Sequence, residues 1–293
     1  MGAVGVELGY LLAFASGFSF ALSDVLTRMA SKHVDRSILV LISLLLGAPY
    51  LWLIGLAVGE QLPPTGPALV FAAIGVVHFG VARYLFYTAI TGLGASSAAV
   101  IVSPVIIISS FLAWLLLGED LTIGKIAGAT LVALAVFLAA DNPSGTPLQG
   151  VSRRKGLAAG LTATMIFSIS SVAVRYAGAA SGSPILGAAI SYTAAIPIPL
   201  VMIRGTFQQR KLHRRAMLLA ALSGLVVTSA QLFRYTALSL VPVVEALVFI
   251  SLFPVHTAVL ASILSGESGE KVRPIHALAA GLAVLGIVFA IRY

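Results

Sequence analysis

Six ionisable residues lie inside long apolar stretches of this sequence: Asp24, His78, Arg83, Arg234, Glu245 and His256. A charged side chain at the centre of a membrane-spanning helix costs about 2.5–3.5 kcal/mol on insertion scales, so such residues face a cavity or another helix. Arginine can hold a carboxylate through two parallel hydrogen bonds, and carboxyl and imidazole groups can exchange protons. These residue types therefore indicate a site for a polar solute.

Two of the six have neighbours that support more than one interpretation. Asp24 shares a helix face with Phe20, as expected beside a cavity, but Arg28 lies four residues further on and can form an ion pair with it. Arg83 aligns with Gln231 when the sequence is shifted by 148 residues. It can bind a substrate carboxylate, or it can extend to the lipid headgroups.

The remaining candidates are assigned by their positions. His78 is central in its stretch and suits cavity lining, proton coupling or a hydrogen bond to a neighbouring helix. Glu245 follows Pro242 in a first helical turn, where a carboxylate also complements the helix dipole. Hydroxyl groups beside aromatic rings suit a cavity for small amphipathic molecules, and a proline bends its helix. The expected substrate-cavity residues are Asp24, His78, Arg83, Ser103, Tyr192, Gln231, Glu245 and Ser251, and the expected hinge residues are Pro104 and Pro254.

The elements that must position these residues are membrane helices. Hydrophobic residues make up 59% of the 293 residues and charged residues 10%, whereas a soluble domain has about 25% charged residues. A spanning helix needs about 20 apolar residues, and the stretches here are too long for the strands of a membrane barrel. The sequence therefore predicts an all-α membrane protein with ten transmembrane helices, near residues 8–30, 37–58, 67–90, 95–117, 122–140, 155–177, 184–204, 216–238, 242–264 and 273–291.

The chain repeats itself at about half its length. Ser23 and Arg28 match Ser170 and Arg175 at an offset of 147, and the Tyr-Thr-Ala triplet at 87–89 recurs at 235–237. We expect one five-helix repeat at 1–141, a linker at 142–152 and a second repeat at 153–293. Because five spans is an odd number, the repeats must insert with opposite orientations. In such inverted-topology proteins the substrate site lies between the repeats.

The distribution of basic residues predicts the orientation of the chain. Lysine and arginine concentrate in the loops after the first, fifth, seventh and ninth stretches. The positive-inside rule then assigns these loops to the cytoplasm and both termini to the other side of the membrane. The formal net charge of +8 is explained by this topology, so we expect no nucleic-acid partner.

Several kinds of chemistry have no support in the sequence. The chain has no cysteine, which excludes disulfides and thiolate chemistry. It has neither the His-Glu-x-x-His motif of metalloproteases nor the phosphate-binding loop of ATPases. We therefore expect a protein that is not an enzyme, that needs no metal or cofactor, and that uses solute gradients for any transport.

The ends of the fourth and ninth stretches carry a recurring pattern. Pro104 is followed by LLLGE at 115–119, and Pro254 is followed by LSGE at 264–267. With two halves of five spans, this pattern resembles the EamA-type permeases of the drug/metabolite transporter superfamily, and most of all the aromatic amino-acid exporters of the YddG type. Ser265 departs from the leucine usual in that family. The resemblance implies export of amino acids or related metabolites across a bacterial inner membrane.

Together these observations predict a secondary transporter or facilitator that exports amino acids or similar small metabolites through a central cavity by alternating access. The alternative is a proton-coupled multidrug or cation exporter with Asp24 or Glu245 as its protonatable site. A membrane-embedded enzyme is a more distant alternative, because it would need a clustered nucleophile and base that the sequence lacks. The expected partners are a small-molecule substrate and the lipid bilayer, and the sequence leaves open whether the protein is a monomer or a dimer.

Overall fold

The computed structural model describes residues 3–139, 151–203, 214–264 and 274–292, and these residues form helices without any strand. The first half contains α1 (Ala3–Ala30), α2 (Arg36–Ala57), α3 (Thr65–Ile74), the π-helix η1 (Gly75–Ala82), α4 (Arg83–Leu93), α5 (Ala95–Val102), α6 (Val105–Leu117) and α7 (Ile123–Ala139). The second half contains α8 (Arg153–Ser181), α9 (Pro184–Ala195), α10 (Pro197–Ile203), α11 (Arg214–Leu240), α12 (Val243–Ile250), α13 (Phe253–Leu264) and α14 (Pro274–Arg292).

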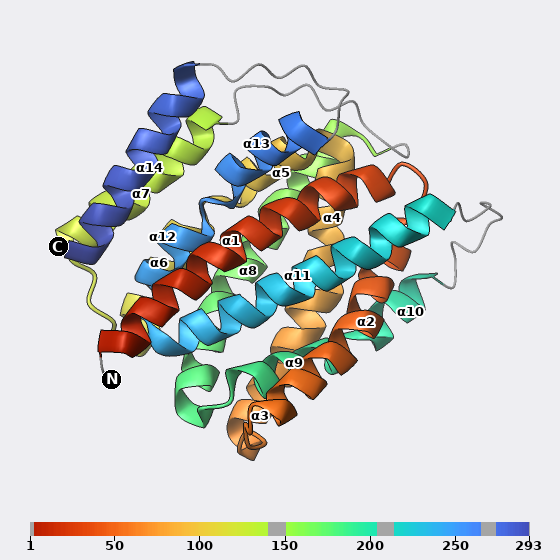
Figure 1. Cartoon of the computed structure of the whole chain (residues 1–293), viewed down its shortest axis with the longest axis horizontal. Coiled ribbons are helices and arrows are strands. Elements are labelled where there is room, and N and C mark those ends of the chain that lie inside the picture. The colour runs from red at the N-terminus through yellow and green to blue at the C-terminus, as the bar shows by residue number, and fades with distance from the viewer. Residues whose placement is uncertain (1–2, 140–150, 204–213, 265–273, 293) are drawn as a thin grey trace.

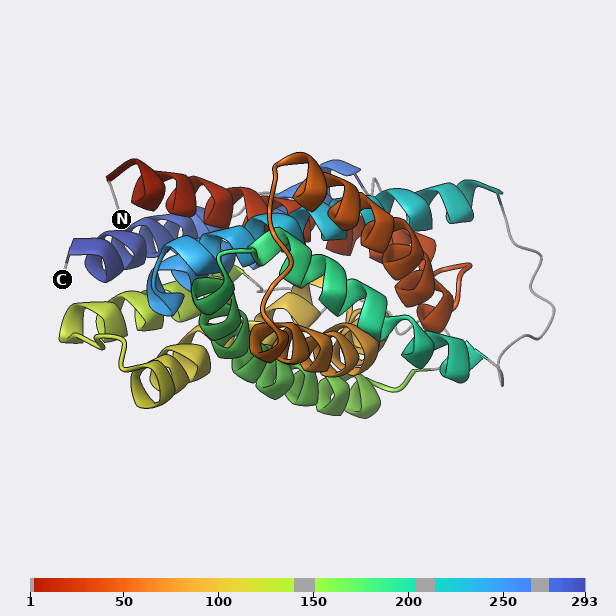
Figure 2. The ribbon, with the colours of Figure 1, turned by 90° about the horizontal axis from the view of Figure 1, so that it is seen from below.

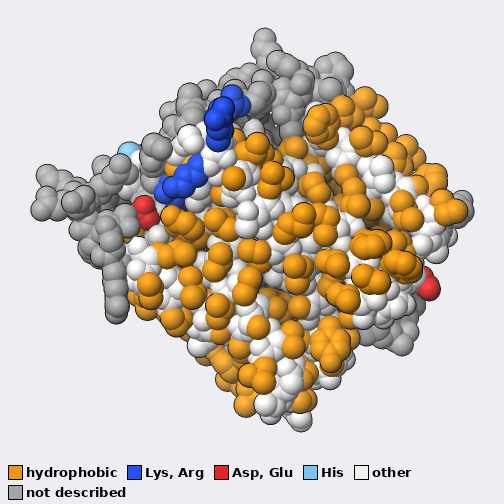
Figure 3. Space-filling model, turned by 180° about the vertical axis from the view of Figure 1, so that it is seen from behind, with side chains coloured by type: hydrophobic (Ala, Val, Ile, Leu, Met, Phe, Trp, Pro, Cys, Tyr) orange, Lys and Arg blue, Asp and Glu red, His pale blue; other side chains and the backbone are white. Residues whose placement is uncertain are grey.

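Many of these helices are long and apolar enough to cross a membrane. Within the described residues, seven segments meet both criteria: Val4–Ala30, Arg36–Ala57, Thr65–Leu93, Val100–Leu117, Arg153–Ser181, Pro184–Ile203 and Arg214–Leu240. Three shorter apolar helices cover the other predicted stretches: Ile123–Leu138, Val243–Thr257 and Gly281–Arg292. Figure 3 shows an outer face covered by hydrophobic side chains, with the few charged ones toward its edges. The chain is therefore a multi-pass membrane protein, and ten crossings stay a prediction.

The helices of the two halves pack between one another. α1 runs along α11, and α8 packs against α3, η1 and α4 (Figure 1). These two contacts are equivalent under the sequence repeat, because each joins the first helix of one half to the third span of the other. α7 and α14 pair beside this bundle, and α1 begins near the point where α14 ends (Figures 1 and 2).

The third span contains an irregular segment where it meets α9. The π-helix η1 separates α3 from α4, and Gly75 begins it. A Cβ atom on Gly75 would lie 2.8 Å from the carbonyl carbon of Ser191 and closer still to the carbonyl oxygen. Only glycine permits so close an approach of two backbones, so Gly75 sets the distance between the third span and α9.

The fourth and ninth spans are each broken. In the first half, α5 ends at Val102 and Pro104 is the N-cap residue of α6. In the second half, α12 ends at Ile250 and α13 begins at Phe253, so the break precedes Pro254, which is the second residue of α13. Proline is compatible with the first turn of a helix, where its missing N–H has no helical partner. The family-like residues at 266 and 267 lie outside the described residues.

Candidate functional site

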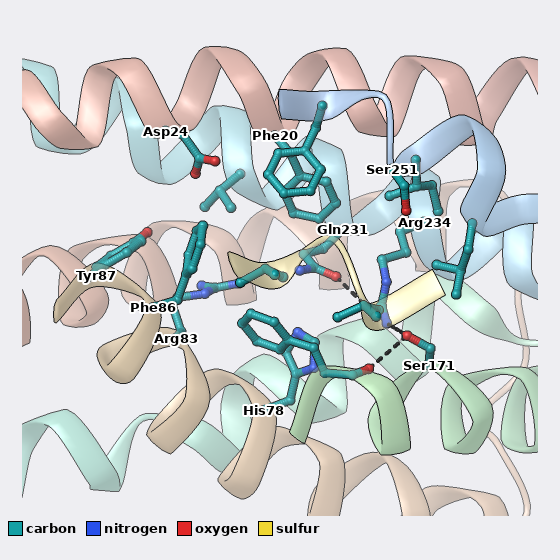
Figure 4. Close-up of a pocket in the computed structure, with 17 residues that line it drawn as sticks. Phe20, Asp24, His78, Arg83, Phe86, Tyr87, Ser171, Gln231, Arg234 and Ser251 are labelled. Carbon is teal, nitrogen blue, oxygen red and sulfur yellow. Dashed lines mark hydrogen bonds between the residues drawn. The ribbon is translucent and has the colours of Figure 1, made fainter. Parts of the chain in front are cut away.

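A cavity of about 100 Å³ lies among side chains from both halves (Figure 4). Its lining comes from α1, η1, α4, α5, α6, α8, α11 and the broken ninth span. Five of the predicted cavity residues line it, namely Asp24, His78, Arg83, Gln231 and Ser251. Its lining also includes Arg234, Ser171 and the aromatic residues Phe20, Phe86, Tyr87, Phe167 and Phe253. The cavity thus combines charged groups with aromatic rings.

Arg83 is fixed at the cavity by neighbours on other helices. Its Nη1 atom donates to the Ser43 hydroxyl at 3.0 Å, and its Nη2 atom donates to the Tyr192 hydroxyl at 2.8 Å. The guanidinium carbon lies 4.6 Å from the centre of the Phe79 ring. Arg83 is only 4% exposed, and no carboxylate among the described residues forms an ion pair with it. Its charge is therefore buried, oriented and available to an anion.

Arg234 presents a second buried guanidinium. Its Nη2 atom donates to the Ser171 hydroxyl at 2.7 Å, and its Nη1 atom donates to the Gln231 side-chain oxygen at 3.3 Å. Arg234 is also 4% exposed. Within the described part of the chain, its hydrogen-bond partners are uncharged, so neither arginine of the cavity forms an ion pair with a protein carboxylate.

Two further titratable side chains at the cavity have a polar atom without a partner. The Oδ2 atom of Asp24 and the Nδ1 atom of His78 are buried and have no hydrogen-bond partner among the residues that the structure describes. The imidazole of His78 packs 4.6 Å from the Phe167 ring, measured between ring centres. A buried polar atom that lacks a partner is costly, so such atoms in a cavity are ready to bind a ligand or water.

The π-helix explains why His78 and Arg83 reach the same cavity. In a regular α-helix, residues five apart point about 140° away from each other. Here the backbone N–H of Arg83 donates to the carbonyl oxygen of His78, which is the i→i+5 bond of a π-helix. This wider turn brings the two side chains onto one face.

The other predicted cavity residues have different positions. Tyr192 does not line the cavity, but its hydroxyl accepts a hydrogen bond from Arg83, which does. Ser103 donates to the carbonyl oxygen of Val100 in the turn before Pro104. Glu245 lies outside the cavity lining, where it accepts a hydrogen bond from the Tyr10 hydroxyl at 2.8 Å and forms an ion pair with Lys125 at 3.2 Å.

The Glu245→Gln variant is expected to keep transport within about twofold of the original protein and to lower stability by about 1–2 kcal/mol. Both Glu245 and Lys125 have side chains that are 14% exposed, so loss of this ion pair leaves the lysine largely buried without its counterion. Flux measurements check the expected transport rate, and thermal unfolding in detergent checks the expected loss of stability. A large loss of flux from protein of unchanged stability would instead assign Glu245 to the substrate pathway.

Each half contains one arginine that joins two of its helices, and the two arginines occupy equivalent positions in the sequence repeat. Arg28 of α1 donates to the carbonyl oxygen of Ile90 at 3.0 Å, and Arg175 of α8 donates to that of Leu238 at 3.1 Å. The donors are separated by 147 residues and the acceptors by 148, as in the sequence repeat. Each arginine therefore ties the first helix of its half to the C-terminal end of the third span, where a cation complements the helix dipole.

Glu119 connects the two halves at one of these points. Its Oε1 atom lies 2.8 Å from Nε of Arg175, and its Oε2 atom accepts the backbone N–H of Val243 at the start of α12. Glu119 belongs to the first half and both of its partners belong to the second. This contact holds the start of the broken ninth span against the end of the fourth.

Some site residues were not among the predicted cavity positions. The sequence does point to Arg234, because a charged residue inside an apolar stretch is unusual. It does not point to Ser171, which is one of many small polar residues in α8. Only the folded chain shows that this hydroxyl contacts Arg234. Among the described residues, no group of three or more histidine or acidic side chains is arranged to hold a metal ion.

Comparison with known proteins gives a family for both halves. Residues 7–140 and 154–292 match the model of the EamA-like transporter family. A solved crystal structure that is 17% identical in sequence has a TM-score of 0.77, and the match covers 100% of this chain and 99% of the other. At this identity the likeness shows a shared fold. A search of the curated proteins gives no significant match.

Proposed function

The chain belongs to the EamA-like transporter family, a family of membrane transporters in the drug/metabolite transporter superfamily, and we propose that it is a secondary transporter that exports an amino acid or a similar small metabolite. In this proposal, ten spans form two inverted five-helix repeats, 1–141 and 153–293, joined by the linker 142–152. The substrate binds between the repeats and is exposed to the two sides of the membrane in turn.

The observation that supports this substrate class most directly is the pair of buried arginines, neither of which forms an ion pair with a carboxylate among the described residues. Arg83 and Arg234 line one cavity, and each uses some of its N–H groups on neutral partners while keeping others for a ligand. Leaving a buried charge without a partner is strongly unfavourable, whereas a carboxylate accepts two parallel bonds from a guanidinium. Amino acids carry such a carboxylate.

One observation favours the alternative of a proton-coupled multidrug or cation exporter. In the described part of the chain, the Oδ2 atom of Asp24 has no hydrogen-bond partner, as expected for a carboxyl group that binds a proton or an organic cation. Two arginines in the same cavity oppose this alternative, because their charge repels a cation. We therefore assign Asp24 to the ammonium group of an amino acid.

Alternating access needs parts of the protein that move as units. The packing of α1 along α11, and of α8 against η1 and α4, supports movement of each first helix together with the third span of the other half. The breaks at Pro104 and before Pro254 are the proposed hinges. The family resemblance suggests a bacterial inner membrane, and the basic loops support an orientation with both termini outside the cytoplasm.

The test is flux of labelled amino acids in proteoliposomes, measured with and without a pH gradient. We expect saturable flux of at least one amino acid in the absence of the gradient, as for a facilitator. Absence of flux for every amino acid, from protein shown to be folded, would contradict the proposal. Flux of organic cations that depends on the gradient would support the alternative.

The Asp24→Asn variant is expected to reduce amino-acid flux about tenfold or more without a pH gradient. Asparagine has nearly the same shape but no charge, so it loses the ion pair with the substrate ammonium group. Initial rates over a range of substrate concentrations check this prediction. If the variant instead loses only the response to a pH gradient, Asp24 carries a proton rather than contacting the ammonium group.

A further inference from the structure

We propose that the cavity selects an acidic amino acid and binds it at three points. Arg83 takes the α-carboxylate, Asp24 takes the ammonium group, and Arg234 takes the side-chain carboxylate. This inference rests on the proposed amino-acid transport and narrows its substrate class.

The charges of the cavity support this class over a neutral amino acid. Apart from His78, the titratable lining residues that bear opposite charges are two guanidinium groups and one carboxylate. A neutral amino acid brings one carboxylate and one ammonium group, so it would leave one buried arginine without a counterion. An acidic amino acid brings two carboxylates and one ammonium group, so every charged group at the site gains an opposite charge.

The positions of the three residues suit the shape of such a ligand. Asp24, Arg83 and Tyr87 lie on one side of the cavity in Figure 4. Arg234 lies on the other side, with Gln231 and His78 between the two arginines in that view. In an α-amino acid the ammonium group and the α-carboxylate share one carbon, whereas the second carboxylate is at the end of the side chain. Asp24 and Arg83 on one side and Arg234 on the other match this arrangement.

Both arginines are oriented before any ligand arrives. Arg83 is bound by Ser43 and Tyr192, and Arg234 is bound by Ser171 and Gln231. A guanidinium that is already fixed loses little conformational freedom on binding, so more of the interaction energy appears as affinity.

The aromatic rings of the cavity support the same interpretation. Phe20, Phe86 and Phe167 line it together with the charged groups. Apolar rings exclude water, which strengthens the attraction between an arginine and a carboxylate and increases the cost of leaving either one unpaired. Selection by charge is therefore sharper here than at an exposed site.

The experiment compares labelled L-glutamate, L-aspartate, L-glutamine and succinate in proteoliposomes. We expect the original protein to carry glutamate or aspartate at least about tenfold faster than glutamine, the loss expected for one charge-assisted contact. Succinate tests the ammonium contact, because it has two carboxylates and no ammonium group, and we expect it to be carried at least about tenfold more slowly as well.

The Arg234→Gln variant tests the position of the second carboxylate. We expect it to lose the preference for glutamate over glutamine, mainly through lower glutamate flux. Arg292→Gln removes an arginine from the exposed end of α14 and serves as the matched control, with an unchanged preference. Because the selectivity of the original protein is itself diagnostic, the test does not depend on how well the variant folds.

The outcomes separate this inference from the proposed function. If the protein carries glutamine as fast as glutamate, or aromatic amino acids in preference to both, the inference is overturned and amino-acid transport stands. Succinate flux equal to glutamate flux would overturn the role of Asp24. If the folded protein transports none of the amino acids, both proposals are overturned.

Discussion

Arg83→Gln is expected to reduce amino-acid transport about 100-fold. The guanidinium of Arg83 lines the cavity and presents N–H groups that Ser43 and Tyr192 do not use. A carboxylate held by two charge-assisted hydrogen bonds gains about 1.5 kcal/mol or more from each. Their loss together is about 3 kcal/mol, which corresponds to about 100-fold. Initial rates in proteoliposomes measure this effect.

A stability measurement distinguishes this loss of binding from loss of folding. Arg83 is 4% exposed and lacks a counterion among the described residues, so its removal also relieves a buried charge. We expect the melting temperature of Arg83→Gln in detergent to be unchanged or higher. Arg83→Lys keeps the charge without the two parallel N–H groups and should give an intermediate rate. Full transport by Arg83→Gln would exclude Arg83 from substrate binding.

Gly75→Ala is expected to lower the stability of the folded protein by about 3 kcal/mol, at the upper end of what overpacking usually costs. The new Cβ atom would lie 2.8 Å from the carbonyl carbon of Ser191. A backbone carbonyl cannot rotate away as a side chain can, so α9 and the third span must separate. Thermal or denaturant unfolding of the purified protein in detergent measures the change.

Gly281→Ala is the matched control for this variant. Gly281 lies in α14, is exposed, and has no atom within 4 Å of an added Cβ. In an open helix position, alanine is about 1 kcal/mol more favourable than glycine. We therefore expect the control to be as stable as the original protein or slightly more so. Equal stability of the two variants would mean that the approach of Gly75 to Ser191 does not limit packing.

Hydropathy predicted the helices of this protein well, because in a bilayer the length of an apolar stretch directly reflects a physical requirement. The high cost of placing an ionisable side chain in the membrane pointed to Asp24, His78 and Arg83, which do line the cavity. It also selected Glu245, whose charge is instead compensated by Lys125. These two residues are far apart in sequence, so no local pattern could show that they meet.

Two features of the site had no sequence signal of their own. The π-helix from Gly75 to Ala82 contains two glycines and three valines, which weaken a regular helix without specifying a π-helix, and its form depends on packing against α8 and α9. The role of Ser171 depends on a contact with Arg234, which lies on another helix. Sequence alone can thus identify which residues are expensive to bury, but tertiary packing decides which of them share a cavity.

The packing of α1 along α11 has a consequence for how the protein is made. The two helices are separated by the residues from 31 to 213, so α1 enters the membrane long before its main partner exists. At about 5–20 residues per second, translation of that interval takes roughly 10–40 s. During this time the face of α1 that carries Asp24 must be accommodated by lipid, the insertion machinery or the helices already made. The order of synthesis therefore favours a late assembly step, in which the cavity forms only when α11 arrives.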